Sequence, residues 1–349
     1  MRVLIIGGTG FIGSYVLRRL LGEGQGHSVA VFHRGQSGSD LPREALRIIG
    51  DRRRLAEYGG EFDRFGPQVV LDMIPYVEED ARSLMATFRG KVERVVAVSS
   101  QDVYRAYGLF LRLEEGELEP TPYDEEAPLR TRLYPYRKTA RGGEDLAYHY
   151  DKIPVERVVM SDPQTPFTIL RLPKVYGPGD RSRLFDYLKR MDDGGEAILL
   201  GERKSRWRWT RGYVENVAAA IAVAVTDARA GNRIYNLGEG DALSESEWAH
   251  GIGQAAGWGA GVVAVPEDAL PQSMLEPYRW EQHLVAETSR FRKELYYEEE
   301  TPRQDALKRA IDWERANPPS EIDLKRFDYA AEDAALKLRC EKHGDGTQI

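Results

Sequence analysis

A glycine triplet near the N-terminus limits the folds open to this chain more than any other feature. The run Val3-Leu4-Ile5-Ile6 is continuously apolar, which is typical of a strand buried on both faces of a sheet. Gly7, Gly10 and Gly13 follow it directly, and a helical pattern starts at Ser14. In such an arrangement the first glycine permits a tight turn, the second admits a pyrophosphate close to the backbone, and the third lets helix and strand pack closely. The triplet favours a phosphate-binding loop over a plain strand-to-helix turn.

Strand and helix patterns alternate after this loop. Further strands are expected at residues 28–32, 47–49, 69–73, 95–99, 167–172 and 233–237, and helices at 14–21, 78–88, 136–150, 181–192, 214–225 and 244–256. Residues 109–132 are polar, acidic and proline-bearing, which predicts an irregular surface excursion. The alternation predicts an α/β fold with a parallel, doubly wound sheet.

The length of 349 residues suggests two domains, or one large unit with an appended part. We expect residues 1–180 to form the domain with the glycine loop, and residues 213–238 to return to that domain. A smaller C-terminal lobe is then expected from 181–320, interleaved with the first domain. Residues 321–349 are highly charged and show no strand pattern, which predicts a peripheral helix or a frayed tail.

Charge and composition narrow the class of partner. There are 49 Lys and Arg against 56 Asp and Glu, a net charge of −7, and this makes nucleic acid an unlikely main partner. The single cysteine, Cys340, excludes an internal disulfide, and the scattered histidines give no metal-binding pattern. The apolar runs are too short for a signal peptide core or a membrane span. We therefore expect a soluble, cytoplasmic protein without a metal site.

Four downstream motifs, together with Gly7-Gly8-Thr9-Gly10-Phe11-Ile12-Gly13, carry a family resemblance. They are Ser99-Ser100-Gln101-Asp102-Val103-Tyr104, Tyr134-Pro135-Tyr136-Arg137-Lys138, residues 171–180 and residues 211–218. In this order and spacing the chain resembles the extended short-chain dehydrogenase/reductase family, the NAD-dependent epimerase/dehydratases, over about residues 1–315. The resemblance implies a Rossmann domain with a substrate lobe, and homodimers are common in the family.

The resemblance implies Ser100, Tyr134 and Lys138 as the catalytic residues. A tyrosine pKa of about 10 is too high for efficient acid–base work near pH 7, and a lysine one helical turn away favours the phenolate. A second Tyr-x-x-x-Lys pair, Tyr148 and Lys152, lies just before Pro154, where a helix is expected to end. Tyr134 instead begins the expected helix, so we favour the first pair.

The implied cofactor is a nicotinamide dinucleotide. NAD-dependent enzymes usually have an acidic residue at the end of the second strand, whereas this chain has His33-Arg34-Gly35. Because an arginine there can pair with a 2′-phosphate, Arg34 favours NADP over NAD. The residues expected to contact the cofactor are Gly7, Thr9, Gly10, Phe11, Ile12, Gly13, His33, Arg34, Asp51 and Lys138.

The substrate is less well defined. The family's 4,6-dehydratases carry two carboxylates beside the catalytic tyrosine, and here Gln101 replaces the first, so elimination is disfavoured although Asp102 can still act as a base. Arg211 matches a family position that contacts a nucleotide diphosphate, which implies a nucleotide-sugar substrate. The leading hypothesis is an epimerase-type oxidoreductase. The alternatives are an NADPH-dependent carbonyl reductase or dehydrogenase, and an RNA-binding protein on the same fold, because the second-strand ending and the unusual fourth strand also resemble chloroplast RNA-binding proteins.

Overall fold

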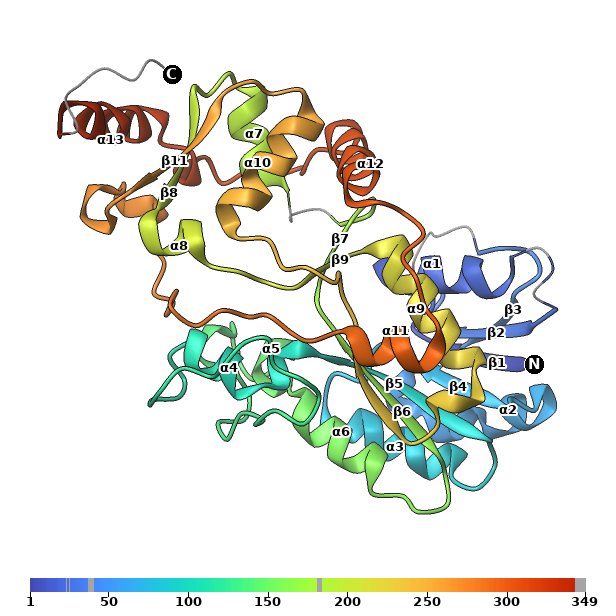
Figure 1. Cartoon of the computed structure of the whole chain (residues 1–349). Helices are drawn as coiled ribbons and strands as arrows, with labels where there is room; N and C mark the ends of the chain where they lie inside the picture. Colours follow the sequence, from blue (N-terminus) through green and yellow to red (C-terminus); the bar gives the residue numbers. More distant parts are fainter. Residues whose placement is uncertain (23, 25, 37–40, 181–183, 343–349) are drawn as a thin grey trace.

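A seven-stranded parallel sheet forms the centre of the computed structural model, which describes residues 1–22, 24, 26–36, 41–180 and 184–342 (Figure 1). The strands lie in the order β10-β6-β5-β4-β1-β2-β3, and every neighbouring pair is parallel. Their bounds are β1 (Arg2–Ile6), β2 (Ser28–His33), β3 (Leu46–Ile49), β4 (Val69–Asp72), β5 (Arg94–Ser100), β6 (Phe167–Leu172) and β10 (Arg233–Asn236). The order reverses between β1 and β4, where parallel sheets of this kind bind their ligands. The prediction of a doubly wound α/β fold is confirmed.

Helices cover both faces of the sheet because β1 is apolar on both sides. Val3 and Ile5 pack on one face with α1 (Phe11–Leu20) and α9 (Val214–Thr226). Leu4 and Ile6 pack on the other with α2 (Gly59–Phe65), α3 (Glu78–Phe88) and α6 (Lys152–Met160). The continuous apolar run that predicted a doubly buried strand is thereby explained.

A second group of elements lies above the carboxyl ends of the strands in the view of Figure 1. It contains the strand pair β8 (Ala197–Gly201) and β11 (Gly261–Val265), and the helices α7 (Phe185–Asp192), α8 (Glu202–Arg206), α10 (Glu245–Ala256), α12 (Arg303–Ala316) and α13 (Tyr329–Lys342). A short pair, β7 (Lys174–Tyr176) and β9 (Arg211–Tyr213), connects this group to the sheet. The predicted helix at 181–192 begins at Phe185 in the described residues, and 181–183 lie outside them.

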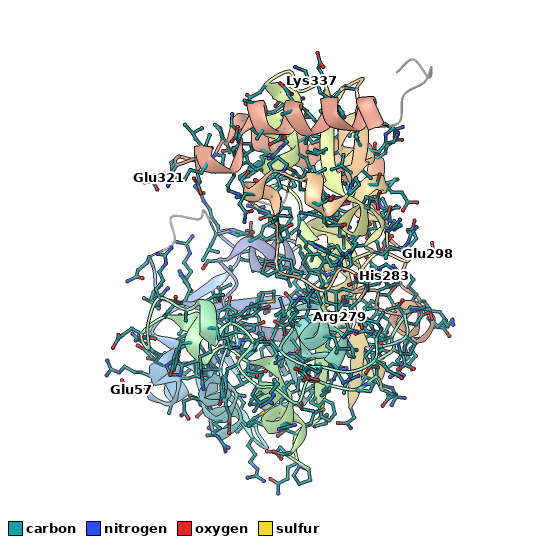
Figure 2. The ribbon with its side chains drawn as sticks, turned by 90° about the vertical axis from the view of Figure 1, so that its left-hand side faces the viewer. Glu57, Arg279, His283, Glu298, Glu321 and Lys337 are labelled. Atoms are coloured by element: carbon teal, nitrogen blue, oxygen red, sulfur yellow. The ribbon has the colours of Figure 1, made fainter. Side chains whose placement is uncertain are left out.

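One extended segment, between residues 275 and 288, crosses from the second group to the sheet before α11 (Ser289–Leu295), and Arg279 and His283 mark it in Figure 2. The Arg279 amide donates to the Phe110 carbonyl on α4 (Arg105–Phe110), and the Leu284 amide donates to the Arg208 carbonyl. The Phe110 ring stacks on Trp207 with centroids 4.8 Å apart. The two parts of the molecule are therefore joined by an aromatic contact as well as by backbone hydrogen bonds.

The helix predicted at 136–150 is wrong. A short 3-10 turn occupies Arg137–Thr139 and a single helical turn, α5, occupies Leu146–His149. Tyr134 has a left-handed φ of +58° and Gly142 a φ of +152°, and neither conformation is helical. Conversely, Pro154 does not end a helix but lies in the first turn of α6, where the missing N–H removes no helical hydrogen bond.

None of the described helices is long and apolar enough to cross a membrane.

Candidate functional site

The glycine loop connects β1 to α1 at the reversal point of the sheet. Gly7 has a φ of +85°, and a Cβ added there would lie 2.8 Å from the Ile74 side chain. A Cβ on Gly13 would lie 2.5 Å from the Gly7 carbonyl oxygen. Gly10 is the N-cap of α1 and supplies no side-chain cap, so the first N–H groups of the helix are available to an anion. The loop therefore fits a dinucleotide pyrophosphate, because its glycines let the backbone turn tightly against β1 and leave the uncapped start of α1 facing the site.

The ends of β2 and β3 hold the three other residues predicted to contact the cofactor near its adenosine half. Arg34 is exposed, and the Asp51 carboxylate binds Arg53 at 2.7 Å. The Arg53 hydrogen bonds, with a smaller contribution from Arg34, lower the pKa of Asp51. His33 Nδ1 accepts a hydrogen bond from the Gly35 amide at 3.2 Å, and burial lowers the pKa of this imidazole. Arg34 is thus an exposed cation that follows β2 and acts on the nearby Asp51 carboxylate.

The end of β4 carries a buried ion pair. Both Asp72 carboxylate oxygens accept hydrogen bonds from the Arg52 guanidinium, at 2.7 and 2.6 Å, and Arg52 also lies 3.0 Å from Asp80. Asp72 Oδ1 also accepts from the Ile74 amide at 3.0 Å. This arrangement fixes the path of residues 72–76, where the sequence departs from the family pattern.

Lys152 is a buried cation at the ends of β4 and β5. Its Nζ donates to the carbonyl oxygens of Pro75 at 2.9 Å and Val98 at 3.0 Å. It also lies 4.9 Å from the Tyr76 ring centroid and 5.8 Å from that of Tyr150. Burial lowers the pKa of Lys152 to about 8, although the charge of Asp72 opposes the shift. The lysine is therefore held at the edge of the sheet where a ligand would bind.

Ser100, Asp102 and Tyr150 meet beside this lysine. The Tyr150 hydroxyl donates to Asp102 Oδ2 at 3.0 Å and also interacts with the Ser100 hydroxyl. Burial, followed by the charge of Asp102, raises the pKa of Tyr150 well above its ordinary value. The sequence predicted a serine, a tyrosine and a lysine for catalysis, and residues of these three types lie together here. Only Ser100 is the residue that was predicted, because the tyrosine is Tyr150 and the lysine is Lys152.

Tyr134 and Lys138 are placed differently from the predicted arrangement. The Tyr134 ring packs on the Arg137 guanidinium, 3.9 Å from the ring centroid, and Lys138 is exposed in the 3-10 turn. Among the described residues, no hydrogen bond or ring contact joins either side chain to Ser100. The same-face argument for this pair required a helix, and without the helix the pair lacks that geometric support.

A helix break explains why sequence reasoning did not select Tyr150 and Lys152. Tyr150 and Asp151 are both extended between α5 and α6, and the Asp151 side chain caps α6 by accepting from the Ile153 amide at 3.0 Å. The break places Tyr150, rather than Tyr148, beside Ser100. Asp151 followed three residues later by Pro154 is an N-terminal helix signal, and it could have indicated that a helix starts here.

Arg211 is buried on β9, at 3% exposure, and its guanidinium pairs with the Glu245 carboxylate on α10. The guanidinium also lies 4.4 Å from the Trp248 ring centroid, and Tyr187 donates to the second Glu245 oxygen. Burial alone would raise the pKa of Glu245, but Arg211, Lys174 and Lys204 outweigh it and lower the value to about 2. The arginine predicted to meet a diphosphate is therefore already paired with a carboxylate in this structure.

The ion pair between Glu245 and Arg211 should stabilise the folded protein less as the solution becomes acidic. Because the Glu245 pKa is lower in the folded chain than its ordinary 4.5, its contribution is complete above about pH 4.5 and disappears as the pH falls towards 2. We expect Glu245→Gln to lower the free energy of unfolding at neutral pH and to lose less of it on acidification than the unchanged protein. Urea midpoints measured across this pH range test the prediction, and parallel curves for the two proteins would contradict it.

No group of three or more His, Cys, Asp and Glu side chains is arranged to hold a metal ion within the parts of the chain that the structure describes.

The comparisons with known proteins agree with this architecture. Residues 3–238 match the model of the NAD dependent epimerase/dehydratase family. A dTDP-glucose 4,6-dehydratase of Streptomyces griseus is 25% identical over 339 residues, which cover 89% of this chain and 93% of that protein. A chloroplast stem-loop binding protein of 41 kDa from Arabidopsis thaliana is 23% identical over 249 residues, covering 68% and 58%.

Solved structures show the same fold. The UDP-glucose 4-epimerase of Thermus thermophilus, solved in complex with NAD, superimposes with a TM-score of 0.63 at 22% identity, covering 91% of this chain and 100% of that one. The family match covers 236 of the 349 residues, from β1 to two residues beyond β10. The family resemblance predicted from the motifs is therefore confirmed. The chain belongs to the NAD-dependent epimerase/dehydratase family.

Proposed function

We propose that this protein is a nicotinamide-dependent oxidoreductase that acts on a hydroxyl or carbonyl group of a nucleotide sugar. The observation that carries the proposal is the meeting of Ser100, Tyr150 and Lys152 at the sheet edge that also bears the glycine loop. The activities in the names of the S. griseus and T. thermophilus relatives support the substrate class.

Each of the three residues has a chemical role in this proposal. Tyr150 exchanges a proton with the reacting oxygen of the substrate, and Ser100 holds that oxygen by a hydrogen bond. Lys152 orients the ribose next to the nicotinamide and keeps a positive charge at the site. The bound nicotinamide supplies the acceptor or donor of hydride. This assignment replaces Tyr134 by Tyr150 and Lys138 by Lys152, and it retains Ser100.

The cofactor is held in this proposal by the residues at the ends of β1, β2 and β3. The amide groups of residues 10–13 meet the pyrophosphate, and Asp51 lies on the adenine side. Arg34 is proposed to pair with a 2′-phosphate, which favours NADP. Because the T. thermophilus epimerase was solved with NAD bound, NAD is the direct competitor.

Arg34 gives the sharpest test of cofactor choice. We expect Arg34→Gln to weaken NADPH binding by roughly 10- to 100-fold, since a hydrogen bond to a charged group contributes about 1.5–3 kcal/mol, and to change NADH binding little. Titrations followed by nicotinamide fluorescence measure both constants. Arg64→Gln, which removes a similarly exposed charge from α2, is the matched control.

The same titrations test the wider proposal. Binding of neither cofactor by the unchanged protein would overturn it, and an equal loss of NADH and NADPH binding in Arg34→Gln would overturn the choice of NADP. A nicotinamide absorbance band that survives purification would favour epimerase chemistry with a retained cofactor. An empty protein that prefers NADPH would favour the second candidate, a reductase that exchanges its cofactor at each turnover, which the exposed Arg34 supports.

A further inference from the structure

Asp102 forms the centre of a buried cluster of tyrosine hydroxyls. It lies in the 3-10 turn Gln101–Val103 after β5 and is 4% exposed. Its Oδ2 accepts from Tyr150 at 3.0 Å and lies 3.1 Å from the Tyr136 hydroxyl, which in turn lies 3.2 Å from that of Tyr107. Its Oδ1 is buried and has no hydrogen-bond partner among the described residues. A carboxyl group is thus buried with capacity for a proton.

The charged groups facing Asp102 do not form an ion pair with it. The Arg130 guanidinium binds the backbone carbonyl of Asp102, the carbonyl of Arg132 and the carboxylate of Asp151. The Lys152 amine is committed to two backbone carbonyls. Burial therefore dominates and raises the pKa of Asp102, although Arg130, the two tyrosine hydroxyls and Lys152 oppose the shift.

Tyr150 is a poor base as long as Asp102 is charged. Burial and then the negative charge of Asp102 disfavour the phenolate, so the tyrosine cannot hold an extra negative charge beside the carboxylate. Lys152 Nζ lies 5.8 Å from the Tyr150 ring centroid. Its hydrogen bonds go to two backbone carbonyls, and none between described residues joins it to the Tyr150 hydroxyl. A proton taken up by Tyr150 thus needs a second acceptor, and the carboxylate oxygen in contact with it is Asp102 Oδ2.

We propose that Asp102 and Tyr150 act as one acid–base pair, in which Tyr150 passes its phenolic proton to Asp102 as it accepts the proton of the substrate. The proposal rests on the proposed function. When a hydroxyl is oxidised, the substrate O–H and C–H bonds break and a C=O bond forms. The proton goes to the Tyr150 oxygen, the Tyr150 proton goes to Asp102 Oδ2, and the two electrons leave as hydride to the oxidised nicotinamide. Reduction reverses each transfer, and Tyr136 holds Asp102 in place by its hydrogen bond.

The pair can be tested without turnover, in the full chain. The C=O stretch of protonated carboxyl groups is followed by infrared spectroscopy during a pH titration. Other buried carboxyl groups with raised pKa values, such as Glu314, will titrate in the same range. We therefore expect one band that is present in the unchanged protein and absent in Asp102→Asn, with a midpoint above the ordinary aspartate value of about 3.9. Tyr150→Phe and Tyr136→Phe each remove a donor to the carboxylate and should raise that midpoint further. Tyr148→Phe, whose ring packs on Arg137 instead, should leave it unchanged.

Proton release provides the second measurement. Calorimetric binding of the oxidised cofactor in buffers of different ionisation enthalpy counts the protons that are released or taken up. If the pair exchanges a proton, the count should differ between the unchanged protein and Asp102→Asn, while their affinities for the cofactor remain similar. A Tyr150→Phe midpoint equal to that of the unchanged protein, or an equal proton count in both proteins, would overturn the pair.

The two proposals fail in different ways. Suppose that neither NADH nor NADPH binds, but Tyr150→Phe shifts the pH midpoint of the Asp102 band. The oxidoreductase proposal and its redox step are then wrong, whereas the coupled titration of Asp102 and Tyr150 is supported. If a cofactor binds and the band does not move, the acid–base pair falls and the oxidoreductase proposal stands. If Asp102→Asn does not fold, Tyr150→Phe still decides the infrared test, because it leaves the carboxyl group in place.

Discussion

Replacing Tyr150 by phenylalanine is expected to reduce turnover by roughly 10²- to 10⁴-fold, the usual contribution of a positioned acid–base group. The change removes one oxygen and leaves the ring, which packs 5.4 Å from Tyr136 and 6.2 Å from Tyr76 between centroids. Folding should therefore be preserved while proton transfer is lost. UDP-glucose and dTDP-glucose are the substrates to test first, with the reaction followed by nicotinamide absorbance and by product analysis.

Two matched tyrosines serve as controls for this loss. Tyr148 keeps the Tyr-x-x-x-Lys spacing to Lys152, and Tyr134 keeps it to Lys138. Both rings pack on the Arg137 guanidinium, at 4.7 and 3.9 Å from their centroids. Tyr148→Phe and Tyr134→Phe should each leave turnover within a few-fold of the unchanged protein. A large loss in Tyr134→Phe with full activity in Tyr150→Phe would restore the assignment made from the sequence.

The central sheet could be predicted from the sequence because its signal is local. Val3-Leu4-Ile5-Ile6 is apolar at every position, and burial on both faces of a parallel sheet requires that pattern. The glycine loop was equally clear, since a side chain on Gly7 would clash with Ile74 and one on Gly13 with the Gly7 carbonyl. Helix α3 was predicted with the bounds that the structure has, from its apolar spacing.

The candidate site could not be predicted in the same way, because it depends on where a helix is interrupted and not on a regular spacing of residues. Residues 136–150 contain enough helix formers to suggest one helix, whereas the structure has two short turns and then an extended Tyr150. The extended conformation is fixed by contacts distant in sequence. Asp151 binds Arg130, and the Tyr134 amide donates to Asp151 at 2.6 Å. Motif spacing assumes a continuous helix, so it cannot identify which side chains a broken helix brings together.

A second large effect is expected in the ion pair that anchors the helix bearing Lys152. The Glu156 carboxylate, one turn after Lys152 on α6, accepts from Arg171 of β6 at 3.0 and 2.8 Å and from Ser99 of β5 at 2.5 Å. The two side chains of the pair are 2% and 1% exposed. We expect Glu156→Gln to lower the free energy of unfolding by about 3–5 kcal/mol, since it leaves the Arg171 charge buried without its counterion. Urea denaturation measures the change.

An exposed pair provides the control for this prediction. Arg54 and Glu57 are 65% and 54% exposed, and Glu57 lies on the outer surface in Figure 2. Glu57→Gln should change the free energy of unfolding by less than about 1 kcal/mol. Replacing both buried partners, as Glu156→Leu with Arg171→Met, should recover much of the lost stability, because no unpaired charge then remains. A loss below about 1 kcal/mol in Glu156→Gln would mean that water reaches this pair. In that case α6 would be held by its other contacts, and the buried position of Lys152 would not depend on Glu156.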